Sequence, residues 1–357
     1  MGKPISFFCP SRQLPFIEII KTVSALYSSQ NPMQLRRLGK TGIDISEIAL
    51  GAGPVSELMV DVDHPQQLAT VNQASEMGIN WVDTAATYGN GASERTLGRT
   101  CSPIHHPQVH VATKVRLSPD ELDDPVRAIR SSLHGSLSRL NRTRVTLLQL
   151  HNSITCNRGD LPTSVTPNDV LRSGGIGDIF EQLRHEGLVD HFGLTGLGDN
   201  VSLQSVIREG PFETIQIPWH LLVPLSESDC HAGSIDVDYG RLLDLCKQAD
   251  MAALVIRVFA GGAITGKPPS RHTHRTPFFP LDLYQRDQQR SEQLKRIFPS
   301  ELSLKEAAVR FVLGHEAVSS AIIGFANPEE VIEVCHYASK GPLDEELLSR
   351  WPQTLPD

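Results

Sequence analysis

The chain has 357 residues, of which 39% are hydrophobic and 21% charged, and its formal net charge is −8 at pH 7. These are ordinary values for a globular protein, and the negative charge excludes a general polyanion-binding surface, so we expect no nucleic-acid partner. No apolar run is long enough to cross a bilayer, and six cysteines are scattered without a C-x-x-C pair, so we expect a cytoplasmic protein with no membrane partner.

The chain divides into a short unpatterned start and one long patterned domain. Residues 1–32 contain an apolar stretch that Lys3, Pro10 and Arg12 interrupt, which does not fit the core of a signal peptide. We therefore expect residues 1–32 to be a flexible N-terminal extension and residues 33–357 to form one domain. Strict alternation of strand-like and helix-like segments, without a change in composition, favours one domain over two.

Short apolar runs alternate with amphipathic segments from Ser46 onward. Strands are expected at residues 48–51, 79–83, 109–114, 145–151, 191–195, 214–217, 252–256 and 319–323. Helices are expected at residues 65–77, 92–98, 125–140, 179–185, 201–207 and 239–248, and from residue 328. About eight strand–helix units close a barrel of parallel strands, so the sequence predicts an α/β fold, a (β/α)8 or TIM barrel.

The longest interruption of this alternation follows the seventh predicted strand. It runs between Phe259 and Pro299 and carries several basic residues, among them Lys267 and Arg271. Long charged loops at the functional end of a barrel commonly cover a ligand. We expect this long loop to be a lid or a ligand clamp.

Four polar residues stand at or just beyond the ends of predicted strands: Asp83, Tyr88, Lys114 and His151. The carboxyl ends of the strands in a TIM barrel meet at one mouth, so these side chains are expected to lie together. A phenol ordinarily has a pKa of about 10, and an ammonium group within hydrogen-bonding range favours its ionised form. With a carboxylate to hold the ammonium and an imidazole to orient a substrate oxygen, the set predicts a proton-transfer site.

Several segments of the sequence resemble the aldo-keto reductase family. They are RRLGKTG at 36–42, GINWVDTA at 78–85, SERTLG at 93–98, ATK at 112–114 and LQLH at 148–151. The resemblance extends in order over about residues 33–351 and is similar to the branch that contains sugar dehydrogenases. It implies hydride transfer between NAD(P) and a carbonyl or alcohol, with the four residues above as the catalytic set and Tyr88 as proton donor or acceptor.

The resemblance also implies which residues hold the cofactor, which this family binds across the barrel mouth without a Rossmann domain. Thr195 and Gln216 match positions that bond the nicotinamide carboxamide, although Gly196 replaces the family's asparagine. No stacking aromatic is present, and Ile256 or Arg257 takes its neighbourhood, where a planar guanidinium can stack. The other positions resemble the pyrophosphate loop, with Gly261, Gly262 and Lys267, and the adenosine end, with Gly324, Asn327 and Glu330.

The adenosine end indicates which cofactor is used. Relatives that prefer NADP often carry a basic residue where this chain has Glu330. A carboxylate repels a 2′-phosphate and accepts a hydrogen bond from a free ribose hydroxyl, so NAD or NADP is expected, with NAD slightly favoured. A carboxylate in the first turn of a helix also stabilises that helix without any cofactor.

Several functions are compatible with this pattern. Oxidation of an aldose at its anomeric carbon is favoured, and reduction of aldehydes or ketones with NADPH is the alternative within the same class. A non-catalytic, cofactor-binding regulatory subunit and a metal-dependent barrel hydrolase are alternatives from other classes. We expect a small carbonyl or sugar substrate and no metal site, and the pattern does not indicate the oligomeric state. Residues 51–56 half-match a dinucleotide fingerprint, but they lack its third glycine and contain a proline.

Overall fold

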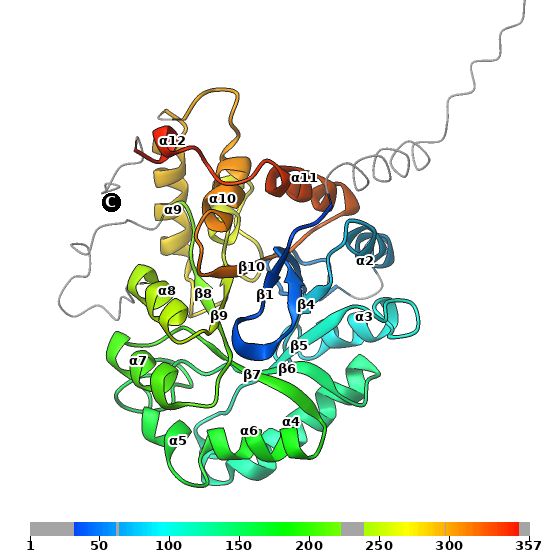
Figure 1. The fold of residues 1–357 in the computed structure, drawn as a ribbon, viewed down its shortest axis with the longest axis vertical. Coiled ribbons are helices and arrows are strands. Elements are labelled where there is room, and N and C mark those ends of the chain that lie inside the picture. Colours follow the sequence, from blue (N-terminus) through cyan, green and yellow to red (C-terminus); the bar gives the residue numbers. More distant parts are fainter. Residues whose placement is uncertain (1–31, 62–63, 223–238, 297, 350–357) are drawn as a thin grey trace, which may run out of the picture.

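Eight parallel strands form a closed barrel at the centre of the molecule (Figure 1). The computed structural model describes residues 32–61, 64–222, 239–296 and 298–349, so all but the last residue of the predicted N-terminal extension lies outside the described residues. The barrel strands are β3 (Ile48–Gly51), β4 (Trp81–Asp83), β5 (His110–Val115), β6 (Val145–Leu150), β7 (Val189–Thr195), β8 (Thr214–Pro218), β9 (Ala252–Ile256) and β10 (Val318–Ile323). β10 pairs with both β3 and β9 and so closes the barrel. The predicted TIM barrel and its eight strands are confirmed.

Helices surround the barrel on its outside (Figure 1). They are α2 (Gln67–Glu76), α3 (Ala92–Thr100), α4 (Pro125–Leu140), α5 (Pro167–Leu171), α6 (Ile176–His185), α7 (Asn200–Glu209), α8 (Tyr239–Gln248), α10 (Leu304–Leu313), α11 (Pro328–Ser339) and α12 (Glu345–Ser349). The sequence prediction missed α5, α10 and α12. In the described part of the chain, no helix combines the length and the apolar character that a membrane span requires.

The helix α4 shows how local sequence sets the helix ends. Asp124 precedes it and accepts a hydrogen bond from the backbone N–H of Arg127 at 3.2 Å, while Pro125 takes the first helical position. Proline suits that position because its missing N–H would have no partner in the helix. Asn141 ends the helix in the left-handed conformation, with a φ of 53°. These caps explain why the predicted and observed bounds of α4 coincide.

An antiparallel hairpin covers the end of the barrel where the strands begin. β1 (Leu35–Arg37) pairs with β2 (Asp44–Ser46), and the intervening turn contains the short helix η1 (Gly39–Thr41). The turn lies against the start of β9, where the backbone N–H of Lys40 donates to Asp250 O at 3.0 Å. Apolar side chains of the hairpin pack on residues inside the barrel: Leu38 and Ile45 on Ala49, Trp81, Ala112, Leu147, Ala252, Leu254 and Ile322. The sequence prediction did not include this hairpin.

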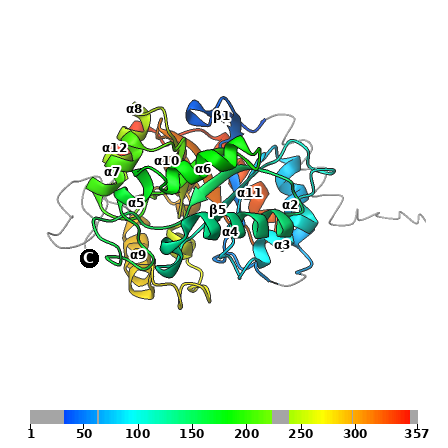
Figure 2. The same ribbon diagram turned by 90° about the horizontal axis from the view of Figure 1, so that it is seen from below.

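The insertion after β9 lies at the opposite end of the barrel, where the strands end. Figure 2 shows the hairpin (blue) on one side of the molecule and the insertion (yellow) on the other. The segment predicted as a long loop is partly helical, because it contains η4 (Ala260–Thr265) and the 14-residue helix α9 (Leu281–Leu294). The Tyr284 hydroxyl on α9 donates to the backbone oxygen of Lys267, which ties this helix to the loop before it.

Candidate active site

Three of the four side chains predicted to be catalytic meet at the carboxyl ends of β4 and β5. The Lys114 ammonium donates to Asp83 Oδ1 at 2.5 Å, to the backbone oxygen of Thr84 at 2.8 Å and to the Tyr88 hydroxyl at 3.3 Å. An ammonium group has three donors, so these three oxygens satisfy it completely. Lys114 is 1% exposed and Asp83 is 3% exposed, so water screens the pair very little.

Strand register and a tight turn bring these groups together. Asp83 is the last residue of β4 and pairs with Ala112 of β5, so Lys114 lies two residues further along and points to the same side. The chain turns directly after β4, and the backbone N–H of Tyr88 donates to Ala85 O at 3.1 Å. Gly89 follows with a φ of 56°, a conformation that glycine adopts without steric cost. The turn therefore places the Tyr88 phenol beside the carboxyl end of β4.

The charges of this cluster support one another. Burial acts to lower the pKa of the Lys114 amine, but the carboxylate of Asp83 and the oxygen of Tyr88 outweigh burial and hold that pKa above its ordinary value. Burial raises the pKa of the Asp83 carboxyl, although Lys114 and Gln216 both act to lower it. The direct contact of the two groups favours the charged form of each. A fixed positive charge thus lies beside the phenol oxygen.

His151 lies beside the phenol at the end of β6. The rings of Tyr88 and His151 meet edge to face with centroids 5.8 Å apart, and His151 Nδ1 lies 3.5 Å from the hydroxyl of Thr87. Burial, followed by the charges of Arg116 and Lys114, lowers the pKa of His151 well below its ordinary value. The imidazole is therefore neutral at neutral pH and offers one donor and one acceptor.

Two predicted cofactor residues bond to buried side chains, and one of them bonds to Asp83 of this cluster. The Gln216 side-chain amide donates to Asp83 Oδ2 across the inside of the barrel. The Thr195 hydroxyl accepts a hydrogen bond from Gln149 Nε2 at 3.1 Å. Gln149 is 0% exposed and belongs to the LQLH segment, but the sequence analysis did not assign it to the site. The signal available in the sequence was a polar residue inside an apolar strand, two positions before His151.

The segment after β9, predicted to be a pyrophosphate loop, contains several residues with positive φ. Arg257 has a φ of 61°, and Ala260, Gly261 and Gly262 have φ values of 50°, 68° and 106°. Within this loop, the backbone N–H of Ala260 donates to Arg257 O at 2.6 Å and that of Gly262 donates to Phe259 O at 2.8 Å. The Arg257 guanidinium stacks over Phe279 at 4.1 Å and lies 3.5 Å from Asp287 Oδ2. Contacts with two residues of the insertion therefore fix the position of the Arg257 side chain.

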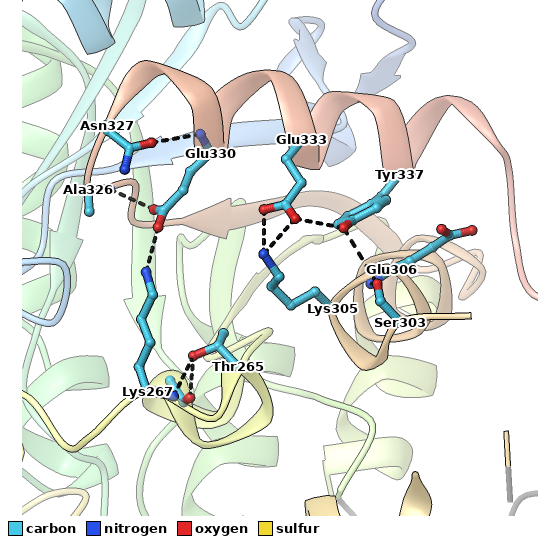
Figure 3. A network of polar contacts seen from close by, with 11 residues as sticks. Thr265, Lys267, Ser303, Lys305, Glu306, Ala326, Asn327, Glu330, Glu333 and Tyr337 are labelled. Atoms are coloured by element: carbon cyan, nitrogen blue, oxygen red, sulfur yellow. Dashed lines mark hydrogen bonds and ion pairs between the residues drawn. The ribbon is translucent and has the colours of Figure 1, made fainter. Parts of the chain in front are cut away.

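The predicted adenosine end lies where β10 leads into α11 (Figure 3). The Asn327 side chain caps α11 by accepting a hydrogen bond from the backbone N–H of Glu330 at 2.9 Å. Glu330 in turn accepts from the backbone N–H of Ala326 at 2.8 Å and from the Lys267 ammonium at 2.5 Å. This last contact joins two predicted cofactor residues that are 63 positions apart in the chain. Gly324, at the end of β10, faces Ser56, because an added Cβ would lie 3.2 Å from its side chain.

Comparison with known proteins assigns this chain to a family. The model of the Aldo/keto reductase family matches residues 47–355, and the chain belongs to that family. The resemblance found in the sequence is thereby confirmed. The family consists of oxidoreductases that use NAD(P) and act on small carbonyl or sugar molecules.

Relatives and solved structures agree with this assignment. An L-galactose dehydrogenase of Arabidopsis thaliana is 26% identical over 332 residues, which cover 89% of this chain and 92% of that protein. A D-threo-aldose 1-dehydrogenase of a Pseudomonas species is 24% identical, with coverages of 84% and 91%. The holo form of an aldo-keto reductase from Bacillus halodurans has a TM-score of 0.67 at 19% identity, with coverages of 91% and 98%. An aldo-keto reductase from Klebsiella pneumoniae in complex with NADPH has a TM-score of 0.62 at 19% identity, with coverages of 91% and 99%. These two structures share the fold of this chain.

Proposed function

We propose that this chain transfers hydride between NAD(P) and a carbonyl or alcohol substrate, with Tyr88 as the proton donor or acceptor. The observation that carries the proposal is the contact of the buried Lys114 ammonium with the Tyr88 hydroxyl at 3.3 Å, backed by Asp83 at 2.5 Å. A phenol placed against a fixed positive charge is suited to exchange a proton with a substrate oxygen. When bound, the nicotinamide supplies or accepts the hydride.

Each residue of the cluster has a separate task in this proposal. During reduction, Tyr88 gives its proton to the substrate oxygen as that oxygen gains negative charge. Lys114 stabilises the negative charge that remains on the phenol, and Asp83 keeps the ammonium in place. His151, as a neutral imidazole, forms a hydrogen bond with the same substrate oxygen and orients it. Oxidation of an alcohol uses the same contacts in reverse.

The residues around the mouth fit a nicotinamide dinucleotide. Gln216 donates its amide N–H to Asp83, so its oxygen stays available to accept from a carboxamide NH2. Thr195 accepts from Gln149, so its hydroxyl proton is available to a carboxamide oxygen. Gly261 and Gly262 leave the phosphate loop without bulky side chains, and Arg257 offers a planar cation beside it. Gly196 offers no side chain to a carboxamide.

We infer that the substrate is an aldose, oxidised at its anomeric carbon to a lactone. The two dehydrogenases of galactose and aldose named above support this inference, because they align over most of the chain. Reduction of aldehydes or ketones with NADPH is the alternative. The test is a panel of aldoses and aldehydes, with absorbance of the reduced cofactor as the readout. The proposal predicts turnover of an aldose, and a protein that turned over only simple aldehydes would contradict it.

We also propose that NAD is slightly favoured over NADP because Glu330 occupies the adenosine end. Lys267 is the nearby cation, but its ammonium is already bonded to Glu330 at 2.5 Å. Glu330→Gln should free Lys267 for a 2′-phosphate and remove a repulsive charge. We expect the ratio of kcat/KM for NADP to that for NAD to rise about tenfold, because a charge-assisted hydrogen bond contributes about 1.5–3 kcal/mol.

Glu329→Gln is the matched control for this experiment. Glu329 is the neighbouring carboxylate in the same first turn of α11, and it is exposed. Glu329→Gln changes the charge of the helix terminus as much as Glu330→Gln does, but it leaves the bond between Lys267 and Glu330 intact. A wild-type protein with a strong preference for NADP, or equal changes in both variants, would exclude Glu330 as the determinant.

Gln149 is expected to position Thr195 for the nicotinamide carboxamide. Gln149→Leu removes the donor that fixes the Thr195 hydroxyl, while a residue of similar size remains in β6. We expect the Kd of the cofactor to rise about three- to tenfold, the worth of one neutral hydrogen bond, with a smaller effect on kcat. Fluorescence titration of the reduced cofactor measures this change. Gln182→Leu, at an exposed position of α6, is the control, and an equal effect there would refute the assignment.

A further inference from the structure

Two adjacent phenylalanines of the insertion lie against arginines from opposite sides of the barrel. The Arg116 guanidinium lies 4.7 Å above the ring centre of Phe278, and that of Arg257 lies 4.1 Å above Phe279. Arg116 directly follows β5 and Arg257 directly follows β9. In the closed barrel, three strands separate β5 from β9 in either direction. The Phe278–Phe279 segment therefore crosses the mouth of the barrel.

Arg116 lies close to the proposed reacting groups. Its Nε donates to the backbone oxygen of His151 at 3.2 Å. Its charge helps to lower the pKa of the His151 imidazole, and the oxygen of Tyr88 acts on the guanidinium in turn. Arg116 therefore lies beside both the residue proposed to orient the substrate oxygen and the residue proposed to exchange its proton.

The charge of Arg116 has no counter-ion in the described part of the chain. Burial lowers the pKa of Arg116, and Tyr88 is the group that acts against this effect. Arg257, at the opposite side of the mouth, has Asp287 at 3.5 Å, whereas no carboxylate lies within ion-pair distance of Arg116 among the described residues. A partly buried cation without a partner is unfavourable, because the protein replaces only part of its hydration.

The contacts of Arg116 leave its outer edge open to a ligand. Phe278 covers one face of the guanidinium and the carbonyl of His151 takes Nε, but no described residue bonds to the two terminal nitrogens. Those nitrogens form the planar fork that binds both oxygens of a carboxylate. A ligand bound there would extend from the proposed reacting oxygen toward Phe278.

We propose that Arg116 recognises a carboxylate on the substrate, so that the substrate class is that of carbonyl or hydroxy acids, and among sugars the uronates. This inference rests on the proposed function and narrows its substrate. In the oxidation of a uronate, the anomeric C–H bond breaks and its hydride passes to the nicotinamide, while the hydroxyl proton passes to the Tyr88 phenolate. The carboxylate is bound by Arg116 and does not react.

The test compares pairs of sugars that differ only at the terminal carbon. D-Galactose with D-galacturonate and D-glucose with D-glucuronate are two such pairs. We expect the wild-type protein to have the higher kcat/KM for the uronate. Arg116→Gln should lower the uronate-to-aldose ratio by about 10- to 100-fold, the range that a hydrogen bond to a charged group contributes. Arg127→Gln, at an exposed position of α4, should leave this ratio as it is in the wild type.

A binding measurement makes the test independent of turnover. Calorimetric titration of the protein with reduced cofactor bound, which cannot accept the hydride, should give a lower Kd for D-galacturonate than for D-galactose, and Arg116→Gln should remove this difference. Equal binding of the two sugars, or an equal loss for both in the variant, would overturn the assignment of Arg116. Turnover of neutral aldoses without a preference for uronates would refute the role of Arg116 but would agree with the proposed function. Absence of turnover with every sugar and aldehyde would refute the proposed function, while the binding result would still decide the role of Arg116.

Discussion

Replacing Tyr88 with phenylalanine is expected to lower kcat by about 100- to 10,000-fold, the usual contribution of a positioned general acid or base. The variant loses only the hydroxyl oxygen, which accepts from Lys114 at 3.3 Å and is proposed to exchange the proton. The ring stays in place beside His151, with its centroid 5.8 Å away, so the surface that binds cofactor should persist. Steady-state kinetics, together with fluorescence titration of the reduced cofactor, separate the two effects.

Tyr337→Phe is the matched control for that experiment. Tyr337 lies on α11, where its hydroxyl donates to Glu333 at 2.8 Å in a surface network with Lys305 and Ser303 (Figure 3). Loss of this hydroxyl removes one hydrogen bond far from the cluster of Asp83 and Lys114, so we expect turnover close to that of the wild type. Wild-type kcat in the Tyr88 variant would refute Tyr88 as the proton donor or acceptor.

The barrel was predictable because its strands and helices carry local signals. Residues 145–151 and 252–256 are short apolar runs, and the helix at 125–140 begins with a capping aspartate and a proline. The hairpin of β1 and β2 has three-residue strands, which are too short to show an alternating pattern. Its stability comes from packing of Leu38 and Ile45 on the inside of the barrel, which local sequence does not reveal.

The sequence predicts which site residues lie together only for residues at the ends of strands. Asp83, Lys114 and His151 follow from strand order alone, because parallel strands of a barrel end at one mouth. The bond between Lys267 and Glu330 depends on how the η4 segment approaches α11, and no local pattern encodes that distance. The same holds for Arg116, whose environment is set by Phe278 from the far side of the barrel.

Buried polar contacts connect the proposed cofactor contacts with the proposed proton-transfer group. Asp83 accepts from Lys114 on one oxygen and from Gln216 on the other, so one carboxylate orients both an ammonium and an amide. An amide that donates in this way keeps its oxygen available as an acceptor. A change at Asp83 is therefore expected to disturb cofactor binding as well as proton transfer, whereas a change at Tyr88 should disturb proton transfer alone.

Lys114→Met should abolish most turnover and also destabilise the protein. The variant removes the charge beside the Tyr88 oxygen, so negative charge on that oxygen is no longer stabilised. It also leaves the Asp83 carboxylate, 3% exposed, with Gln216 as its remaining side-chain partner. Breaking one side of a buried ion pair typically costs about 3–5 kcal/mol of the free energy of unfolding. Urea unfolding measures the stability, and steady-state kinetics measure the turnover.

The double variant Asp83→Asn/Lys114→Met separates these two effects. Replacing both members of a buried pair removes the unpaired charge, and such replacements are often neutral or stabilising. We therefore expect the free energy of unfolding to recover toward the wild-type value, because the new amide can still accept from Gln216. Turnover should stay low, since no ammonium remains beside the phenol. If turnover recovered together with stability, the role of Lys114 would be to keep the fold intact, and the phenol would need another source of charge stabilisation.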